Sequence, residues 1–199
     1  MVVAVSVGAV LALRVFRPDP AELLKIRIAE RALGSEKAPV WITEYFDYQC
    51  PPCAMARVLL ERTVAEHPGQ VYLQVRFFPM PAHKNGLKAA VFAECVSRQK
   101  GKFWKFHEEM FKRQNEWAAD DYAPFKFASY AESAGADLKR LDICAQDPET
   151  EKSVIEEKKK AEAVGVQATP TFYVNGKMVV GVTALLGELK TAFDKAASS

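Results

Sequence analysis

The sequence has few of the residues that structural metal sites use, with four cysteines and three histidines among 199 residues. Cys50 and Cys53 form a close pair, but Cys95 and Cys144 each stand alone, and no histidine pair follows at zinc-finger spacing. A structural zinc site usually takes its ligands from two such pairs. We therefore predict no metal site.

The chain also lacks a strong excess of charge of either sign. Its 27 basic and 25 acidic residues leave a formal charge of +2. A charge this small gives no strong field to attract nucleic acid, so we expect no nucleic-acid partner. The apolar share of 49% and the charged share of 26% are typical of a soluble globular protein, and the length suits one domain with or without an appendage.

Long apolar runs are missing too, and the N-terminus has only a short one. Residues 1–13 carry no charged side chain and precede Arg14 and Arg17. The run is short for a bilayer span but has the length of a signal-peptide core. It could be an uncleaved anchor, a signal segment that starts upstream, the end of a lost span, or a buried terminal strand or helix. Basic residues after it argue against a simple anchor. We favour export or anchoring and exclude residues 1–16 from the fold.

The next stretch has the composition of a helix. Asp19 and Pro20 are typical of an N-cap and a first helical turn, and Gly34 is a typical terminator. We therefore predict that residues 21–33 are helical and assign residues 17–37 to a linker helix.

The close cysteine pair indicates redox chemistry. Cys50 precedes a helical pattern over residues 54–66, and Pro51 and Pro52 suit the first helical positions. Unpaired backbone N–H groups and the helix dipole stabilise a thiolate at this place and lower its pKa. Cys50 is therefore the predicted nucleophile, and Cys53, one turn further in, is the resolving thiol. A purely structural disulfide is a poor alternative because so short a loop constrains the unfolded chain little.

The stretch before the pair predicts a buried strand with one unusual residue. Residues 40–46 are almost wholly apolar, and Glu44 is the exception. Burial should raise the pKa of this carboxyl and place it beneath the active site, where it could accept a proton from Cys53 through water. The alternative is that Glu44 faces solvent at the sheet edge. A second strand over residues 70–78 completes a βαβ unit and puts Cys50 at the carboxyl end of a strand.

Residues 85–165 show helical patterns separated by turn residues. Their aromatic side chains fit a helical core better than a peptide-binding surface. Cys95 and Cys144 lie in two of these helices, either as buried free thiols or, in an exported protein, as a second disulfide. The predicted helices are 87–98, 103–112, 124–133, 138–145 and 148–164.

The C-terminal stretch predicts a hairpin and a closing helix. Asn175 and Gly176 lie between two apolar, β-prone runs, which is the strongest short hairpin signal. Pro170 leads directly into the first run, and a cis bond is one way to accommodate it because proline cannot donate to the sheet. Residues 183–197 are predicted to form the last helix.

Three features together resemble the thioredoxin superfamily: the Cys-Pro-Pro-Cys pair at a helix start, the Thr169-Pro170 step before the hairpin, and the final helix. The 120 residues from Cys50 to Pro170 are too many for a minimal thioredoxin. This length is similar to the branch with a large helical insertion, the DsbA-like disulfide oxidoreductases. The resemblance covers roughly residues 38–197.

The resemblance implies an α/β fold, the thioredoxin fold, in which helices flank a central mixed sheet. We assign it to a domain over residues 38–199. An all-helical insertion over about residues 85–147 is expected between the second strand of the βαβ unit and the cis-proline strand.

The resemblance also implies a role for each matching residue. Cys50 is then the attacking and attacked sulfur, Cys53 the resolving thiol and Glu44 the buried acid. The redox-active disulfide between Cys50 and Cys53 serves in place of a cofactor. Cys95 and Cys144 are similar to the extra disulfide of some members. The residues implied to meet a substrate strand are Ala168, Thr169 and the cis-proline Pro170.

The function that the resemblance implies is thiol–disulfide exchange with cysteine-containing exported proteins, as a disulfide-donating oxidase. Its expected place is extracytoplasmic, in a periplasm or at the outer face of a membrane, with a quinone-linked membrane partner for reoxidation. The Pro51-Pro52 dipeptide differs from the best-known oxidase and reductase pairs, so a disulfide reductase or isomerase is the alternative enzyme. A chaperone-like binding module with the same fold is the alternative from another class.

Overall fold

The computed structural model describes residues 28–198 of the chain. The apolar segment 1–16 and residues 17–27 of the predicted linker helix lie outside the described residues. Between residues 28 and 198, no helix is both long and apolar enough to cross a membrane. The expectations for the N-terminal segment therefore stay predictions.

The centre of the fold is one mixed sheet. In the described part of the chain its strands are β1 (Ala32–Gly34), β2 (Val40–Phe46), β3 (Val71–Phe77), β4 (Thr171–Val174) and β5 (Lys177–Val180). Their order across the sheet is β1-β3-β2-β4-β5. The strands β2 and β3 run parallel, as the βαβ prediction requires, and the other neighbours pair antiparallel. The predicted hairpin is present, with Asn175 at φ 48° and Gly176 at φ 84° in its turn.

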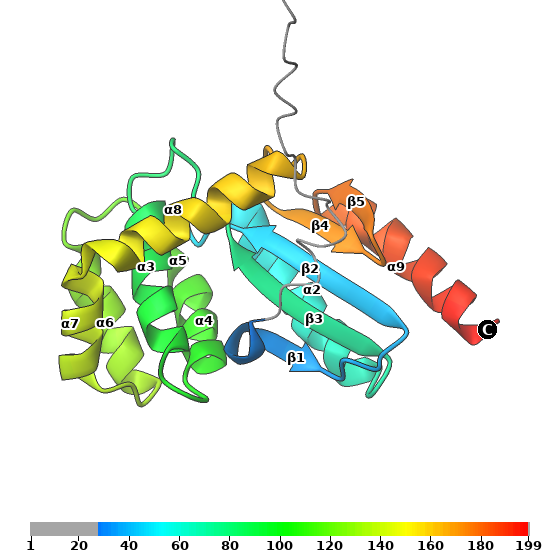
Figure 1. The fold of residues 1–199 in the computed structure, drawn as a ribbon, viewed down its shortest axis with the longest axis horizontal. Coiled ribbons are helices and arrows are strands. Elements are labelled where there is room, and N and C mark those ends of the chain that lie inside the picture. Colours follow the sequence, from blue (N-terminus) through cyan, green and yellow to red (C-terminus); the bar gives the residue numbers. More distant parts are fainter. Residues whose placement is uncertain (1–27, 199) are drawn as a thin grey trace, which may run out of the picture.

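Helices cover both faces of this sheet. They are α2 (Pro51–Glu66), α8 (Pro148–Ala163) and α9 (Val182–Ala197), with α8 in front of the sheet and α2 behind it in Figure 1. Successive residues of a strand face opposite sides. On β2, Tyr45 packs in a buried cluster with Ala161 of α8, whereas Ile42 and Phe46 pack in the cluster that contains Cys53. Glu44 lies between these two residues on the same face and therefore points towards α2 and the cysteines.

The helical insertion gathers at one end of the sheet (Figure 1). Its helices are α3 (Gly86–Ser97), α4 (Phe103–Lys112), α5 (Gln114–Trp117), α6 (Ala123–Ser133) and α7 (Leu138–Gln146). The sequence pattern predicts all of these except the short α5. Phe103, Phe106, Phe111 and Trp117 are buried in the main core, which confirms the interpretation as helical core. The fold is the expected thioredoxin fold with a helical insertion.

The predicted linker helix is wrong where the structure describes it. Residues 28–37 contain a 3-10 turn, η1 (Ala29–Arg31), and then the strand β1, which pairs antiparallel with β3. A Cβ at Gly34 would lie 1.9 Å from the Val71 carbonyl oxygen. Gly34 is therefore needed for close approach to the sheet, at φ 84°, and does not end a helix.

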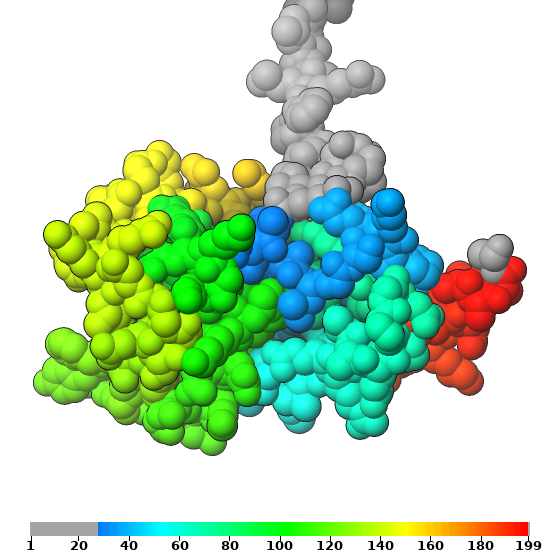
Figure 2. Space-filling view, turned by 90° about the horizontal axis from the view of Figure 1, so that it is seen from below, coloured from blue at the N-terminus to red at the C-terminus, as the bar shows by residue number. Residues whose placement is uncertain are grey.

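Contacts with distant residues hold this N-terminal segment in place. Arg31 is buried, with Nη2 2.9 Å from Oε2 of Glu157 on α8 and its guanidinium 4.1 Å from the centroid of the Phe77 ring. The indole nitrogen of Trp104 donates to the Ala32 carbonyl oxygen at 3.3 Å. Figure 2 shows the segment, in blue, against the green helices of the insertion. Tertiary packing thus overrides the helical composition of residues 28–33.

Candidate active site

The cysteine pair lies where β2 passes into α2. Cys50 is the N-cap of α2, with extended backbone angles, and Pro51 and Pro52 occupy the first two helical positions. Both sulfurs are free thiols; Cys50 is 5% exposed and Cys53 is 0% exposed. Cys50 is therefore the sulfur that an incoming group meets first.

The cis-proline loop lies against Cys50. The bond between Thr169 and Pro170 is cis, and the Cys50 thiol donates to the Thr169 carbonyl oxygen at 3.3 Å. The carbonyl oxygen of Ala168 accepts a hydrogen bond from the Thr171 hydroxyl at 2.7 Å. The structure thus brings Thr169, the middle one of the three residues implied for substrate binding, into contact with Cys50, 119 residues away in the sequence.

The environments of the two sulfurs have opposite effects on their pKa values. The hydrogen bond from the Cys53 thiol is the largest cause that lowers the pKa of Cys50, to about 6. The backbone N–H of Cys53 contributes less, so backbone donors at the helix start are not the main cause. Burial raises the pKa of Cys53 well above its ordinary value. Near neutral pH the pair therefore carries a thiolate at Cys50 and a proton at Cys53.

Glu44 is buried beneath the pair. Its residue is 1% exposed, which contradicts the alternative of a solvent-facing carboxylate at the sheet edge. Burial is the main cause that raises its pKa to about 8, with smaller contributions from the negative charges of Cys50 and Glu61. Within residues 28–198, its Oε1 atom has no hydrogen-bond partner. An acid that titrates near neutral pH beside Cys53 has the properties of a proton donor and acceptor.

Glu44→Gln should stabilise the reduced protein by about 3 kcal/mol at neutral pH. The unfolded carboxyl ionises near its ordinary pKa of 4.5, while the folded one keeps its proton up to about pH 8. Between these values the folded state binds more protons, so the wild type loses stability as the pH rises. Glutamine is neutral throughout and removes this loss. Urea unfolding across this pH range measures the effect.

The matched control is Glu66→Gln at the end of α2, because Glu66 is exposed and, among residues 28–198, pairs with Arg62 at 2.7 Å. Its stability should follow the wild type at every pH. A stability difference between Glu44→Gln and the wild type that does not change with pH would contradict the buried, protonated carboxyl.

Sequence reasoning missed the polar contacts that hold the cysteine loop. Gln114, on α5, donates from Nε2 to the carbonyl oxygens of Tyr48 at 2.6 Å and of Cys50 at 3.1 Å. The side-chain oxygen of Gln49 accepts from the Asn85 backbone N–H at 2.7 Å. These contacts fasten the loop to the helical insertion. No local pattern marks Gln114, because it lies 64 residues from Cys50 in the chain.

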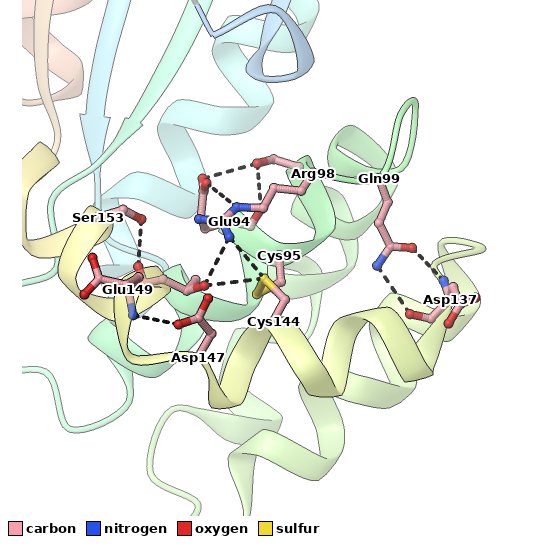
Figure 3. Close-up of a disulfide and its surroundings, with 11 residues drawn as sticks. Glu94, Cys95, Arg98, Gln99, Asp137, Cys144, Asp147, Glu149 and Ser153 are labelled. Carbon is pink, nitrogen blue, oxygen red and sulfur yellow. Dashed lines mark hydrogen bonds and ion pairs between the residues drawn. A yellow bond between two sulfur atoms is a disulfide. The ribbon is translucent and has the colours of Figure 1, made fainter.

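The expected second disulfide is present in the insertion (Figure 3). Cys95 of α3 and Cys144 of α7 are bonded across 49 residues of sequence. The Arg98 side chain lies beside this disulfide. Its Nη1 atom is 3.7 Å from the Cys144 sulfur and 3.2 Å from the Thr150 hydroxyl. The cross-link therefore joins two helices of the insertion.

Comparison with known proteins places the chain in a family. The family model described as Thioredoxin matches residues 27–191. An Na(+)/H(+) antiporter NhaA 1 from Mycolicibacterium vanbaalenii is 35% identical over an alignment of 172 residues, and the match covers 80% of this chain but 26% of that protein. The chain thus spans about a quarter of the length of the curated relatives that match first. A probable disulfide bond formation protein D from Bacillus cereus is 27% identical, and the match covers 83% of this chain and 78% of that protein.

Solved structures agree with this placement. Oxidised BdbD from Bacillus subtilis has a TM-score of 0.74 and 25% identity, and the match covers 85% of this chain and 93% of that one. The α-DsbA1 protein of Wolbachia pipientis has a TM-score of 0.75, and the match covers 88% and 95% of the two chains. Its identity of 20% makes it evidence for the fold alone. The chain therefore belongs to the thioredoxin superfamily and has the fold of its DsbA-like thiol–disulfide oxidoreductases.

Proposed function

We propose that the chain exchanges disulfides with cysteine-containing proteins and acts as a disulfide donor. One observation carries this proposal: a helix-capping Cys50 with a pKa of about 6, in contact with the cis-proline loop, lies beside a Cys53 whose pKa is raised. This asymmetry gives one sulfur that is stable as a thiolate and one that holds its proton.

In the donor reaction the oxidised protein carries a Cys50–Cys53 disulfide. A substrate thiolate attacks the Cys50 sulfur, which forms a mixed disulfide and breaks the bond to Cys53. Cys53 leaves with the electron pair and takes up a proton, for which Glu44 is the neighbouring acid. A second substrate thiolate then attacks the substrate sulfur and releases Cys50 as a thiolate. The substrate gains one disulfide, and the protein gains two electrons.

One feature of the site supports this direction, and a second supports contact with a substrate strand. The low pKa of Cys50 stabilises the reduced protein, and a stabilised reduced form makes the disulfide more oxidising. The Thr169 carbonyl oxygen near the Cys50 sulfur is an acceptor that an extended substrate strand can use. Ala168, Thr169 and Pro170 would then position the substrate cysteine against Cys50.

The site of action in this proposal is extracytoplasmic, with a membrane redox partner that returns the pair to the disulfide. Similarity to a protein named for disulfide bond formation and to a periplasmic thioredoxin-like protein of Salmonella enterica supports this place. The matched antiporters carry a stretch like this chain within much longer proteins named as transporters. That also favours a position beside a membrane. Anchoring by residues 1–16 belongs to the same proposal.

The measurement that tests the direction is the reduction potential of the Cys50–Cys53 pair in glutathione buffers. We expect about −120 mV, the range of strong oxidants, and oxidative refolding of a reduced substrate protein by the oxidised chain. A Cys95→Ala/Cys144→Ala variant is measured in parallel, so that the second disulfide cannot contribute. A value of about −270 mV would instead favour a reductase or isomerase. Binding of unfolded chains without any exchange would favour a chaperone-like module.

A further inference from the structure

A buried carboxylate lies next to the active site and takes no part in the exchange steps above. Asp47 follows β2 directly, and its side chain is 0% exposed. Its carboxylate accepts from the backbone N–H groups of Gln49 at 2.7 Å and of Met80 at 2.6 Å. The Nδ1 atom of His83 lies 2.7 Å from its Oδ2. Asp47 thus joins the cysteine loop to the segment between β3 and α3.

The start of α3 is shaped around this carboxylate. A Cβ at Gly86 would lie 2.7 Å from Oδ2 and 2.8 Å from Oδ1 of Asp47. The backbone N–H of Gly86 donates to the His83 carbonyl oxygen at 3.1 Å, and that of His83 donates to the Met80 carbonyl oxygen at 3.0 Å. The segment 80–86 therefore wraps the carboxylate in two successive turns and leaves no space for a larger residue at position 86.

The charge of Asp47 disfavours the thiolate form of Cys50 on which the exchange reaction depends. Burial is the larger cause that raises the pKa of Cys50, and the charge of Asp47 adds a smaller contribution in the same direction, against the hydrogen bonds that lower it. Glu44 also interacts with Cys50, and burial keeps it protonated up to about pH 8. The His83 side chain, 25% exposed, places its Nδ1 atom 2.7 Å from Oδ2 of the Asp47 carboxylate on the solvent side.

We propose that Asp47 is a positioning residue that fixes the cysteine loop and limits the thiolate character of Cys50, and that His83 offsets the charge of Asp47. The proposal deepens the proposed function, because the fraction of Cys50 thiolate sets both reactivity and redox poise. Asp47 and His83 then have opposite effects on the ionisation of the Cys50 thiol. Removal of either residue should move the Cys50 titration, in opposite directions.

The test is a titration of the reduced protein, in which thiolate absorbance in the ultraviolet reports the ionisation of Cys50. Asp47→Asn keeps the shape of the side chain and removes its charge, so the midpoint should fall, with an acid dissociation constant at least about threefold higher. His83→Gln keeps a hydrogen-bond donor but removes the imidazole, so the midpoint should rise. In the Asp47→Asn background, His83→Gln should have a much smaller effect.

Asp121→Asn is the matched control. It removes one acidic charge from an exposed side chain that pairs with Lys84, next to His83 in the chain, and should leave the midpoint unchanged. A midpoint that stays in place in Asp47→Asn while the melting temperature falls would overturn the proposal in favour of a purely structural role. If that variant does not fold, His83→Gln alone decides: a midpoint that falls or stays in place refutes the offset.

The titration needs no turnover, so the two proposals can fail separately. A thioredoxin-like potential in the wild type, together with the expected opposite shifts, would reject disulfide donation and leave the roles of Asp47 and His83 standing. An oxidising potential with no shifts would do the reverse.

Discussion

Replacing Cys50 with serine should abolish thiol–disulfide exchange, and replacing Cys53 should stop the reaction halfway. A serine hydroxyl forms no disulfide, so Cys50→Ser leaves no sulfur at the cis-proline loop for a substrate to attack. In Cys53→Ser the Cys50 thiolate can still attack a substrate disulfide, which breaks that bond, forms a mixed disulfide and releases the other substrate thiolate, but no neighbouring thiol is present to release the substrate from Cys50. Exchange should fall to the background rate in the first variant, and mixed disulfides should accumulate in the second.

The residue that replaces Cys53 should decide how fast substrates are trapped. The hydrogen bond from the Cys53 thiol is the largest cause that lowers the pKa of Cys50. A serine hydroxyl can replace that donor, whereas alanine cannot. Cys53→Ser should therefore keep most of the thiolate at neutral pH and trap substrates quickly. Cys53→Ala should raise the pKa of Cys50 and trap them more slowly.

Non-reducing gels and mass spectrometry of trapped adducts check both parts. Cys50→Ser is the control for trapping, because any adduct that it forms must come from another cysteine. Exchange that persists in Cys50→Ser would contradict the assigned nucleophile. Equal trapping rates in Cys53→Ser and Cys53→Ala would contradict the assigned hydrogen bond. Unchanged biological activity in Cys50→Ser would favour a binding module.

Local signals explain why much of the fold could be predicted from the sequence. The strand β2 begins and ends at the predicted residues, since an apolar run bounded by a turn and a helix start leaves little choice. The hairpin follows from Asn175 and Gly176, whose positive φ values few other residues adopt. Prolines also mark two parts of the site in the sequence. Pro51 and Pro52 indicate that Cys50 stands at a helix start, and Pro170 before a strand indicates the cis bond.

The parts that could not be predicted depend on partners far away in the chain. Residues 32–34 form a strand only because β3 is there to pair with them, and their composition fits a helix equally well. Asp47 reads as an ordinary turn residue after a strand, and nothing nearby points to His83, 36 residues later. Gln114 lies in a four-residue helix that shows no periodicity. Positioning residues of this kind become visible only when the fold brings the loops together.

The second disulfide should contribute strongly to stability. A Cys95→Ala/Cys144→Ala variant should lose about 4 kcal/mol of unfolding free energy, since the bond closes a loop of 49 residues in the unfolded chain. Urea unfolding of this variant, of the wild type, and of the wild type with reduced cysteines measures the effect. The two forms without the bond should agree closely, because the cross-link and not the lost sulfur atoms provides the stability.

The same variant tests whether the insertion supports the active site. The closed loop carries α5, whose Gln114 holds the Tyr48 and Cys50 carbonyl oxygens. A bond that acts only on the unfolded chain leaves these contacts intact in the folded protein. The titration midpoint of Cys50 should therefore match the wild type while the protein is folded. A moved midpoint would show that the bond also holds α5 in place, and a loss below about 1 kcal/mol would contradict the entropic account.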